Sequence, residues 1–298
     1  MSNRTVHAPG RTARTTRKGQ MPGRRIGHLW SALSVVLASV GCAPPGPRAP
    51  EAATDTLRHR LSMPGDVQGL SLSYLLGGDA SGPLLVLVHG TPGSATGWAD
   101  YLLDPPPGMA VIALDRPGFG DSGPDGAVTR LREQAEAVLA LLPTDGRRVV
   151  LLGHSLGGPV VARVAAEHPE RVSALVLLAA SLDPKLETIH PMQRVGNWPW
   201  VRGMLPRSIR NANAELMALK PELESLAVLL PKIKARVVIV HGTLDDLVPV
   251  DNVAFMQARL TGARCVKTVL LPGGNHFLPW NSPALVRDAV RLALDESC

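Results

Sequence analysis

Six short, mainly apolar runs recur along this chain, and their alternation with stretches of helical spacing constrains the fold more than any other feature. The runs are Leu84–Val88, Val111–Leu114, Val149–Leu152, Ala174–Leu178, Val237–Val240 and Val266–Leu271. Helical spacing occurs over Thr129–Leu142, Pro159–His168 and Pro283–Leu294. This alternation predicts an α/β fold with a mostly parallel central sheet flanked by helices. Ligands bind at the carboxyl ends of such strands, so we seek functional residues in the turns that follow the runs.

One stretch, residues 181–231, breaks the alternation because it joins two predicted strands without containing a strand itself. A connection of that length is rarely without structure in a compact domain. We therefore expect a small helical cap over the strand ends at about 181–231, with Trp198 and Trp200 lining a substrate pocket. A helical excursion on the surface, unrelated to substrate, is the alternative.

The positive charge of the chain is confined to its beginning. The net charge is +6, but residues 1–41 contain seven of the 31 Lys and Arg residues and no Asp or Glu, which leaves 24 basic and 25 acidic residues after them. The remainder of the chain is close to neutral. The chain is 45% apolar, and the remainder is long enough to bury one large core. We expect one principal domain and no nucleic-acid partner.

The same beginning has the layout of an export signal, with Arg24 and Arg25 before the apolar stretch Leu29–Val40. That stretch is too short to span a membrane comfortably. Met21 could be the true start, which would make residues 1–20 an artefact of the gene model. Residues 1–41 are therefore expected to direct export.

The segment Ser39-Val40-Gly41-Cys42 resembles a bacterial lipobox, although Ser39 stands where leucine is usual. The resemblance implies lipidation of Cys42, and the alternative is an ordinary secretory signal. Residues 42–58 are rich in Pro and Ala, which favours an extended tether before a domain at 59–298. We expect a membrane-anchored lipoprotein facing the periplasm or cell exterior, or otherwise a secreted protein.

Export would place Cys265 and Cys298 in an oxidising compartment, where a disulfide is permitted. Pairing of the two cysteines and burial of two free thiols both remain open from sequence.

The strongest chemical motif follows the run Val149–Leu152, where the sequence continues Gly153-His154-Ser155-Leu156-Gly157. Glycines on either side of Ser155 allow a sharp turn from strand to helix, which leaves the hydroxyl at the apex. This G-x-S-x-G spacing, between a predicted strand and a predicted helix, indicates a nucleophilic serine.

A serine needs a base and an orienting acid to become nucleophilic, and in this arrangement they follow in the order acid, then histidine. The strand at Val237–Val240 runs into a turn with Asp245, and the strand at Val266–Leu271 runs into a turn with His276. His154 neighbours Ser155, but adjacent side chains on such a turn point apart, so His276 is the expected base. His89 and His241 are expected to brace turns.

Over about residues 70–296 the chain resembles the α/β-hydrolase superfamily. The acid turn of that family commonly reads G-x-x-D-x-x-V-P, which is matched here by Gly242, Asp245, Val248 and Pro249. The resemblance implies that Asp245 is the acid and that Asp246 is out of register. Asp183 is a second alternative, since some members carry the acid at the end of the earlier strand.

The resemblance also implies an oxyanion hole, formed by the backbone amides of Leu156 and Thr91. Thr91 lies in the run His89-Gly90-Thr91-Pro92-Gly93, after the strand Leu84–Val88. The charged run from Asp115 to Gly123 is also typical of the family, and we interpret it as a structural turn beside the site.

A serine at the turn, rather than the aspartate of haloalkane dehalogenases and epoxide hydrolases, favours acyl transfer. The sequence predicts a serine hydrolase that cleaves a carboxylic ester of a small or apolar molecule through an acyl-enzyme, without metal or organic cofactor. A meta-cleavage-type carbon–carbon hydrolase, a lactonase and a prolyl aminopeptidase are alternatives, although the last commonly has glycine at the position of Thr91. An inactive hydrolase fold that only binds is the non-enzymatic alternative, and the oligomeric state stays open.

Overall fold

The computed structural model describes residues 51–63 and 71–297. The predicted export signal at 1–41, the predicted lipidation site Cys42, and Cys298 lie outside the described residues. Cys265 is disulfide-bonded, so of the two possibilities left open from sequence a free thiol does not apply to it. Cys298 as its partner stays a prediction, because that residue lies outside the described ones.

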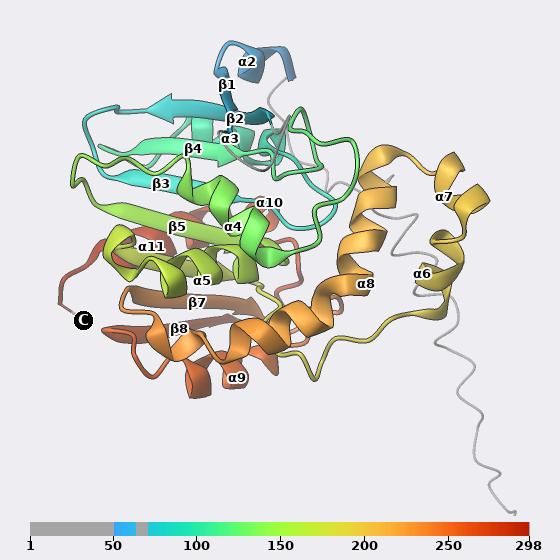
Figure 1. Ribbon diagram of the computed structural model, residues 1–298. Coiled ribbons are helices and arrows are strands. Elements are labelled where there is room, and N and C mark those ends of the chain that lie inside the picture. The colour runs from blue at the N-terminus through green and yellow to red at the C-terminus, as the bar shows by residue number, and fades with distance from the viewer. Residues whose placement is uncertain (1–50, 64–70, 298) are drawn as a thin grey trace, which may run out of the picture.

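Eight strands form one sheet in the order β1-β2-β4-β3-β5-β6-β7-β8 (Figure 1). They are β1 (Arg58–Ser62), β2 (Ser71–Gly78), β3 (Leu84–Val88), β4 (Ala110–Leu114), β5 (Val149–His154), β6 (Ala174–Leu178), β7 (Arg236–Gly242) and β8 (Cys265–Leu271). The first two strands are antiparallel to their neighbours, and the other pairs are parallel. The predicted α/β fold with a mostly parallel sheet is confirmed.

The antiparallel edge corrects the predicted tether at 42–58. Glu51–Asp55 forms the short helix α2, and β1 already begins at Arg58, so the ordered fold starts earlier than expected. Sequence pattern did not reveal β1 because an edge strand can be polar. Here β1 pairs through its backbone with residues 71–75 of β2.

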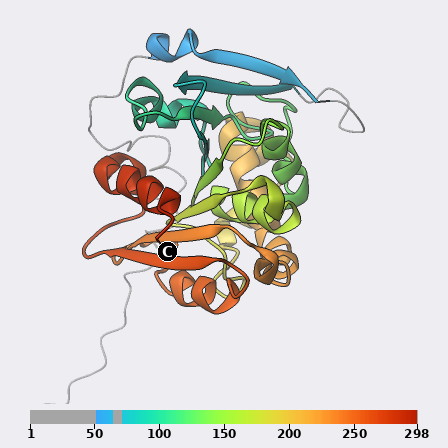
Figure 2. The ribbon, with the colours of Figure 1, turned by 90° about the vertical axis from the view of Figure 1, so that its left-hand side faces the viewer.

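Helices cover both faces of the sheet in two layers (Figure 2). One layer contains α4 (Leu131–Leu139), α5 (Gly157–Glu167) and α9 (Asn252–Arg259), and the other contains α3 (Ala99–Leu103) and α11 (Pro283–Leu294). The short helix α10 (Leu278–Asn281) precedes α11. Single turns of 3-10 helix occupy Ala95–Trp98, Pro169–Arg171 and Leu230–Lys232.

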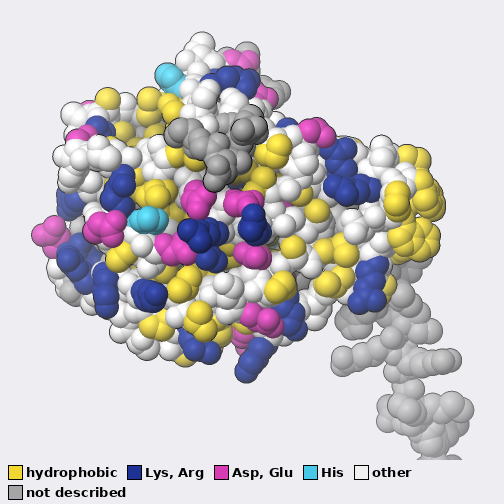
Figure 3. Space-filling view, viewed as in Figure 1, with side chains coloured by type: hydrophobic (Ala, Val, Ile, Leu, Met, Phe, Trp, Pro, Cys, Tyr) yellow, Lys and Arg dark blue, Asp and Glu magenta, His cyan; other side chains and the backbone are white. Residues whose placement is uncertain are grey.

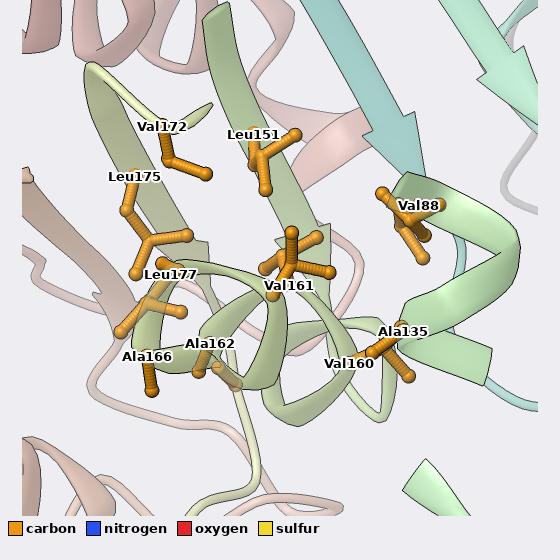
Figure 4. Packing of buried hydrophobic residues seen from close by; sticks show 14 of the residues in the cluster. Val88, Ala135, Leu151, Val160, Val161, Ala162, Ala166, Val172, Leu175 and Leu177 are labelled. Carbon is orange, nitrogen blue, oxygen red and sulfur yellow. The ribbon is translucent and has the colours of Figure 1, made fainter. Parts of the chain in front are cut away.

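The core between α5 and the sheet fixes the position of the turn after β5. Figure 4 shows Val160 and Val161 of α5 in the same buried cluster as Leu151 of β5 and Val88 of β3, with Val161 on the side of Leu151. All four side chains are fully buried. Burying an aliphatic side chain of this size contributes roughly 1.5–3 kcal/mol, so this packing holds the strand and the helix rigidly on either side of Ser155.

Three helices stand between β6 and β7, where the helical cap was expected: α6 (Pro191–Gly196), α7 (Pro199–Met204) and α8 (Arg207–Ala227). Figure 1 shows α6 and α7 standing away from the sheet layers. The second half of α8 instead belongs to the core, because Leu219, Leu223 and Leu226 are buried in the cluster under α5. The cap is therefore smaller than the predicted range 181–231.

No helix within 51–63 and 71–297 is both long and apolar enough to cross a bilayer.

Candidate active site

Ser155 occupies a strained turn between β5 and α5. Its backbone φ is 55°, one of two positive values at non-glycine residues in the described chain. A Cβ on Gly153 would lie 2.3 Å from the carbonyl oxygen of Gly157, and a Cβ on Gly157 would lie 2.3 Å from the carbonyl oxygen of Val88. Only glycine fits at these two positions, so the predicted G-x-S-x-G turn exists because strand and helix meet too closely for side chains.

The loop after β3 lies directly against this serine. A Cβ on Gly90 would lie 2.7 Å from Cβ of Ser155 and 3.2 Å from its Oγ. The next amide along, that of Thr91, makes no hydrogen bond to another described residue, and the same is true of the Leu156 amide. Two unpaired backbone donors on the loops around one serine hydroxyl have the chemistry that an oxyanion hole requires.

Asp245 and His276 meet at the ends of β7 and β8. Nδ1 of His276 donates to Oδ2 of Asp245 over 2.8 Å, and both side chains are buried. Oδ1 of Asp245 accepts from the amides of Leu247 and Val248 at 3.0 and 2.8 Å. Burial by itself would raise the pKa of Asp245, but the hydrogen bond and charge of His276, with the two amides, outweigh it and lower that pKa. Asp245 is thus a buried carboxylate held in one orientation.

The two alternative acids are placed differently. Asp183 accepts from the Lys185 amide through Oδ1, over 2.9 Å, and its own amide donates to Asn252, so it closes a local turn after β6. Asp246 is exposed. Within the described part of the chain, neither contacts His276.

Three further histidines brace the site. Nε2 of His154 donates to the backbone carbonyl of His276 over 3.0 Å, and the two rings lie 4.7 Å apart. Burial, followed by the nearby charge of His276, lowers the pKa of His154 to about 3, so its ring is neutral and serves as a donor. Nε2 of His241 donates to the Val248 carbonyl over 2.9 Å, and His89 donates through Nδ1 to the Gly90 carbonyl over 2.7 Å.

Arg116 joins the cap helix to the loop beside Ser155. Its guanidinium is fully buried and donates to the carbonyl oxygens of His89 and Gly90 at 2.9 and 3.0 Å. The same group donates to both carboxylate oxygens of Glu215 on α8, at 2.7 and 3.1 Å, and also to Gln134. The run containing Arg116 therefore has the structural role expected of it.

Glu215 was not predicted from sequence as the partner of this arginine. The sequence did contain a signal for a buried acid. Glu215, Leu219 and Leu223 lie four residues apart, on one face of α8, and an acid on an apolar helix face needs a buried partner.

Arg116→Met is expected to lower the free energy of unfolding by about 3–5 kcal/mol, because it leaves the Glu215 carboxylate buried without its counter-ion. Urea titration of the variant measures this. Arg132→Met is the matched control, since it removes the exposed pair with Glu136 and should cost less than about 1 kcal/mol. Equal losses in the two variants would contradict the prediction.

Three exposed apolar side chains stand next to the acid and the histidine in the chain. Leu244 and Leu247 flank the turn at Asp245, and Phe277 follows His276; all three are exposed. The Phe277 ring lies 5.8 Å from that of His276. These three residues were not predicted from sequence to belong to the site, although each lies close in the chain to the predicted acid or histidine.

Trp198 and Trp200, predicted to line the pocket, lie on the surface of the cap with their rings 6.0 Å apart. Their pocket role stays a prediction. In the described ranges no group of three or more His, Cys, Asp or Glu residues could hold a metal ion.

Comparison with known proteins agrees with this architecture. The model of the alpha/beta hydrolase fold family matches residues 83–216, which include the loop after β3 and the turn with Ser155. The family model and the fold therefore agree that the chain is an α/β hydrolase in architecture.

Curated relatives match part of the chain. Identity is 34% over 181 residues with the dihydrolipoyllysine-residue acetyltransferase component of the acetoin cleaving system of Pseudomonas putida, covering 59% of this chain and 44% of that protein. It is 38% over 125 residues with pyrrolizixenacetamide deacetylase of Xenorhabdus hominickii, covering 41% and 44%. The chain thus spans less than half the length of these relatives.

Among solved structures, a bacterial membrane phospholipase A shares 24% identity with a TM-score of 0.61, over 90% of this chain and 93% of that one. At this identity the likeness establishes the fold.

Proposed function

We propose that this protein is a serine hydrolase that cleaves a carboxylic ester of a small or apolar substrate through an acyl-enzyme on Ser155. The observation that carries the proposal is the buried 2.8 Å hydrogen bond from His276 to Asp245, at the same sheet edge as the strained turn of Ser155. Such a pair gives the neutral imidazole a defined tautomer, with Nδ1 protonated and Nε2 available as a base.

In the proposed reaction His276 alternates between base and acid, while Asp245 and the two amides stabilise the charges that develop. His276 takes the proton of Ser155 through Nε2 while the serine oxygen attacks the ester carbonyl, and Asp245 stabilises the imidazolium that forms. The amides of Thr91 and Leu156 hold the oxyanion. The intermediate collapses as His276 gives its proton to the leaving alcohol, and water then hydrolyses the acyl-enzyme with His276 again acting as base.

The exposed side chains of Leu244, Leu247 and Phe277 support an apolar acyl or alcohol group, because they offer uncharged surface beside the reacting residues. Carbon–carbon bond hydrolysis, lactone opening and prolyl aminopeptidase activity would use the same three residues. A relative named as a deacetylase adds amide cleavage to the bonds that should be assayed.

Labelling with a fluorophosphonate probe, read by peptide mass spectrometry, and hydrolysis of p-nitrophenyl esters of graded acyl length test the proposal. We expect a single adduct on Ser155 and turnover of the esters. Labelling without ester turnover would favour the carbon–carbon or amide alternatives. Absence of labelling would contradict the hydrolase proposal and favour an inactive binding module.

On sequence grounds we also propose export and lipidation at Cys42, which incorporation of palmitate at that residue would test.

A further inference from the structure

Exposed apolar side chains gather on the first half of the cap. Of eleven large hydrophobic side chains exposed in the described residues, five lie within residues 189–204: Ile189, Met192, Trp198, Trp200 and Met204. The last three are 52%, 64% and 71% exposed. Figure 3 shows hydrophobic side chains grouped at the edge of the molecule over α7. Such a group on a folded chain marks an interaction surface rather than scattered exposure.

The charges in this part of the chain are of one sign. Between Glu187 and Glu215 there are four arginines and no acidic residue. Arg207 and Arg210 pair with Asp125, at 3.5 and 2.7 Å. Arg194 and Arg202, in contrast, are exposed and form no ion pair with any described residue. Free positive charge therefore lies beside the apolar group.

The two cap tryptophans are exposed, whereas Trp98, whose Nε1 also has no hydrogen-bond partner, is buried and Trp280 is half-buried. Nε1 of Trp280 donates to the Gly97 carbonyl over 2.8 Å, whereas the indole N–H groups of Trp198 and Trp200 make no hydrogen bond to a described residue. An exposed indole with a free N–H suits the interface of a lipid bilayer, where the ring contacts the apolar chains and the N–H can donate to the polar headgroups.

The backbone under these side chains is firmly attached. Proline begins α6 and α7, and the side chain of His190 caps α6. The Asn213 side chain on α8 donates to the Gln193 carbonyl over 2.9 Å, which ties α6 to the long helix. The apolar group thus projects from a helical support.

We propose that this surface, formed by Ile189, Met192, Arg194, Trp198, Trp200, Arg202 and Met204 and called here the cap face, docks on an anionic lipid membrane. The tryptophans would enter the headgroup region and the two unpaired arginines would contact lipid phosphates. Asp125 lines a hollow together with Arg202, but it is already paired with Arg207 and Arg210. A second protein copy could cover the apolar side chains, but the only charged residues of the cap face are its two arginines, which would repel those of another copy, whereas an anionic bilayer supplies the counter-charge.

Vesicle partitioning of the full chain tests the cap face. All variants carry Trp30→Phe and Cys42→Ser, which remove a tryptophan outside the described residues and the proposed anchor. With vesicles of phosphatidylcholine and phosphatidylglycerol, we expect a blue shift of tryptophan emission on binding. Trp198→Ser with Trp200→Ser should abolish the shift and weaken partitioning at least about tenfold.

Two comparisons sharpen this experiment. Val228→Ser with Leu270→Ser removes two exposed apolar side chains outside the cap and should leave partitioning unchanged. Arg194→Gln with Arg202→Gln should weaken binding to the anionic vesicles about 25-fold, at about fivefold per arginine, and leave binding to pure phosphatidylcholine unaffected.

Unchanged partitioning in the tryptophan pair variant would overturn the proposal. The proposal would also be overturned if the parent did not bind vesicles but formed a concentration-dependent dimer in sedimentation, and the tryptophan pair variant stayed monomeric. Ser155→Ala should bind vesicles like the parent, because Ser155 is not one of the cap-face residues proposed to contact lipid. Failure of the hydrolase proposal would therefore leave the membrane result intact, and the reverse also holds.

Discussion

Ser155→Ala is expected to lower kcat for a p-nitrophenyl ester by about 10⁶-fold, the loss seen when a serine hydrolase is deprived of its nucleophile. Gly90, Gly153 and Gly157 crowd the backbone of this turn, which holds Ser155 at its apex. Alanine keeps the same Cβ and tolerates the same φ of 55° no worse than serine does, so the turn should persist. Activity measured beside urea unfolding separates lost chemistry from lost structure.

Ser208→Ala is the matched control, since it makes the same atomic change at an exposed position on α8. The free energy of unfolding of both variants should stay within about 1 kcal/mol of the parent, as is usual for small changes away from the core. A Ser155→Ala protein that retains more than a thousandth of the parent activity, after exclusion of contaminating enzyme, would remove Ser155 from the role of nucleophile.

Much of the sheet could be predicted because parallel strands buried on both faces must be apolar along their length. The runs that became β3 to β7 could be recognised for this reason. The run of β8 is apolar as well, although this strand lies at the sheet edge and is only partly buried. β1 does not, because an antiparallel edge strand may be polar: Arg58 of β1 donates to Asp115 rather than entering the core. The start of the ordered fold was misplaced by the same cause.

The residues of the candidate site could be predicted where a local turn motif identifies them, but not where the site depends on contacts between segments far apart in the sequence. The glycines around Ser155 and the register of the acid turn are properties of a few neighbouring residues. The bridge from Arg116 to Glu215 joins positions 99 residues apart in the sequence, and no local pattern states that they pair. The exposure of Trp198 is likewise a property of where α6 and α7 stand relative to the core, which periodicity within short helices does not specify.

Asp245→Asn is expected to lower kcat by about 10⁴-fold without disrupting the site. Oδ1 of Asp245 accepts from the amides of Leu247 and Val248, so the carbonyl oxygen of an asparagine must take that position. Its NH₂ group then faces Nδ1 of His276 in place of Oδ2, and it can only donate. The imidazole would be forced into the tautomer with Nε2 protonated, which cannot accept the proton of Ser155.

Asp183→Asn and Asp246→Asn are the matched controls, because they make the same change at the two alternative acids. Each should keep kcat within about threefold of the parent, as neither carboxylate contacts His276 in the described structure. A large loss in either variant, with Asp245→Asn retaining a tenth of the activity, would reassign the acid.

Stability against pH gives Asp245 an independent signature. Because its pKa in the folded protein is lowered from the ordinary value of 3.8, the ionised carboxylate stabilises the fold above that pH. This contribution is lost as pH falls from 3.8 through the lowered pKa. Asp245→Asn should therefore be less stable than the parent at pH 7, and the difference in urea unfolding free energy should narrow as the pH is brought below 3.8. A difference that does not change with pH would mean that Asp245 is not held as a stabilised carboxylate, and its role in orienting His276 would lose its electrostatic basis.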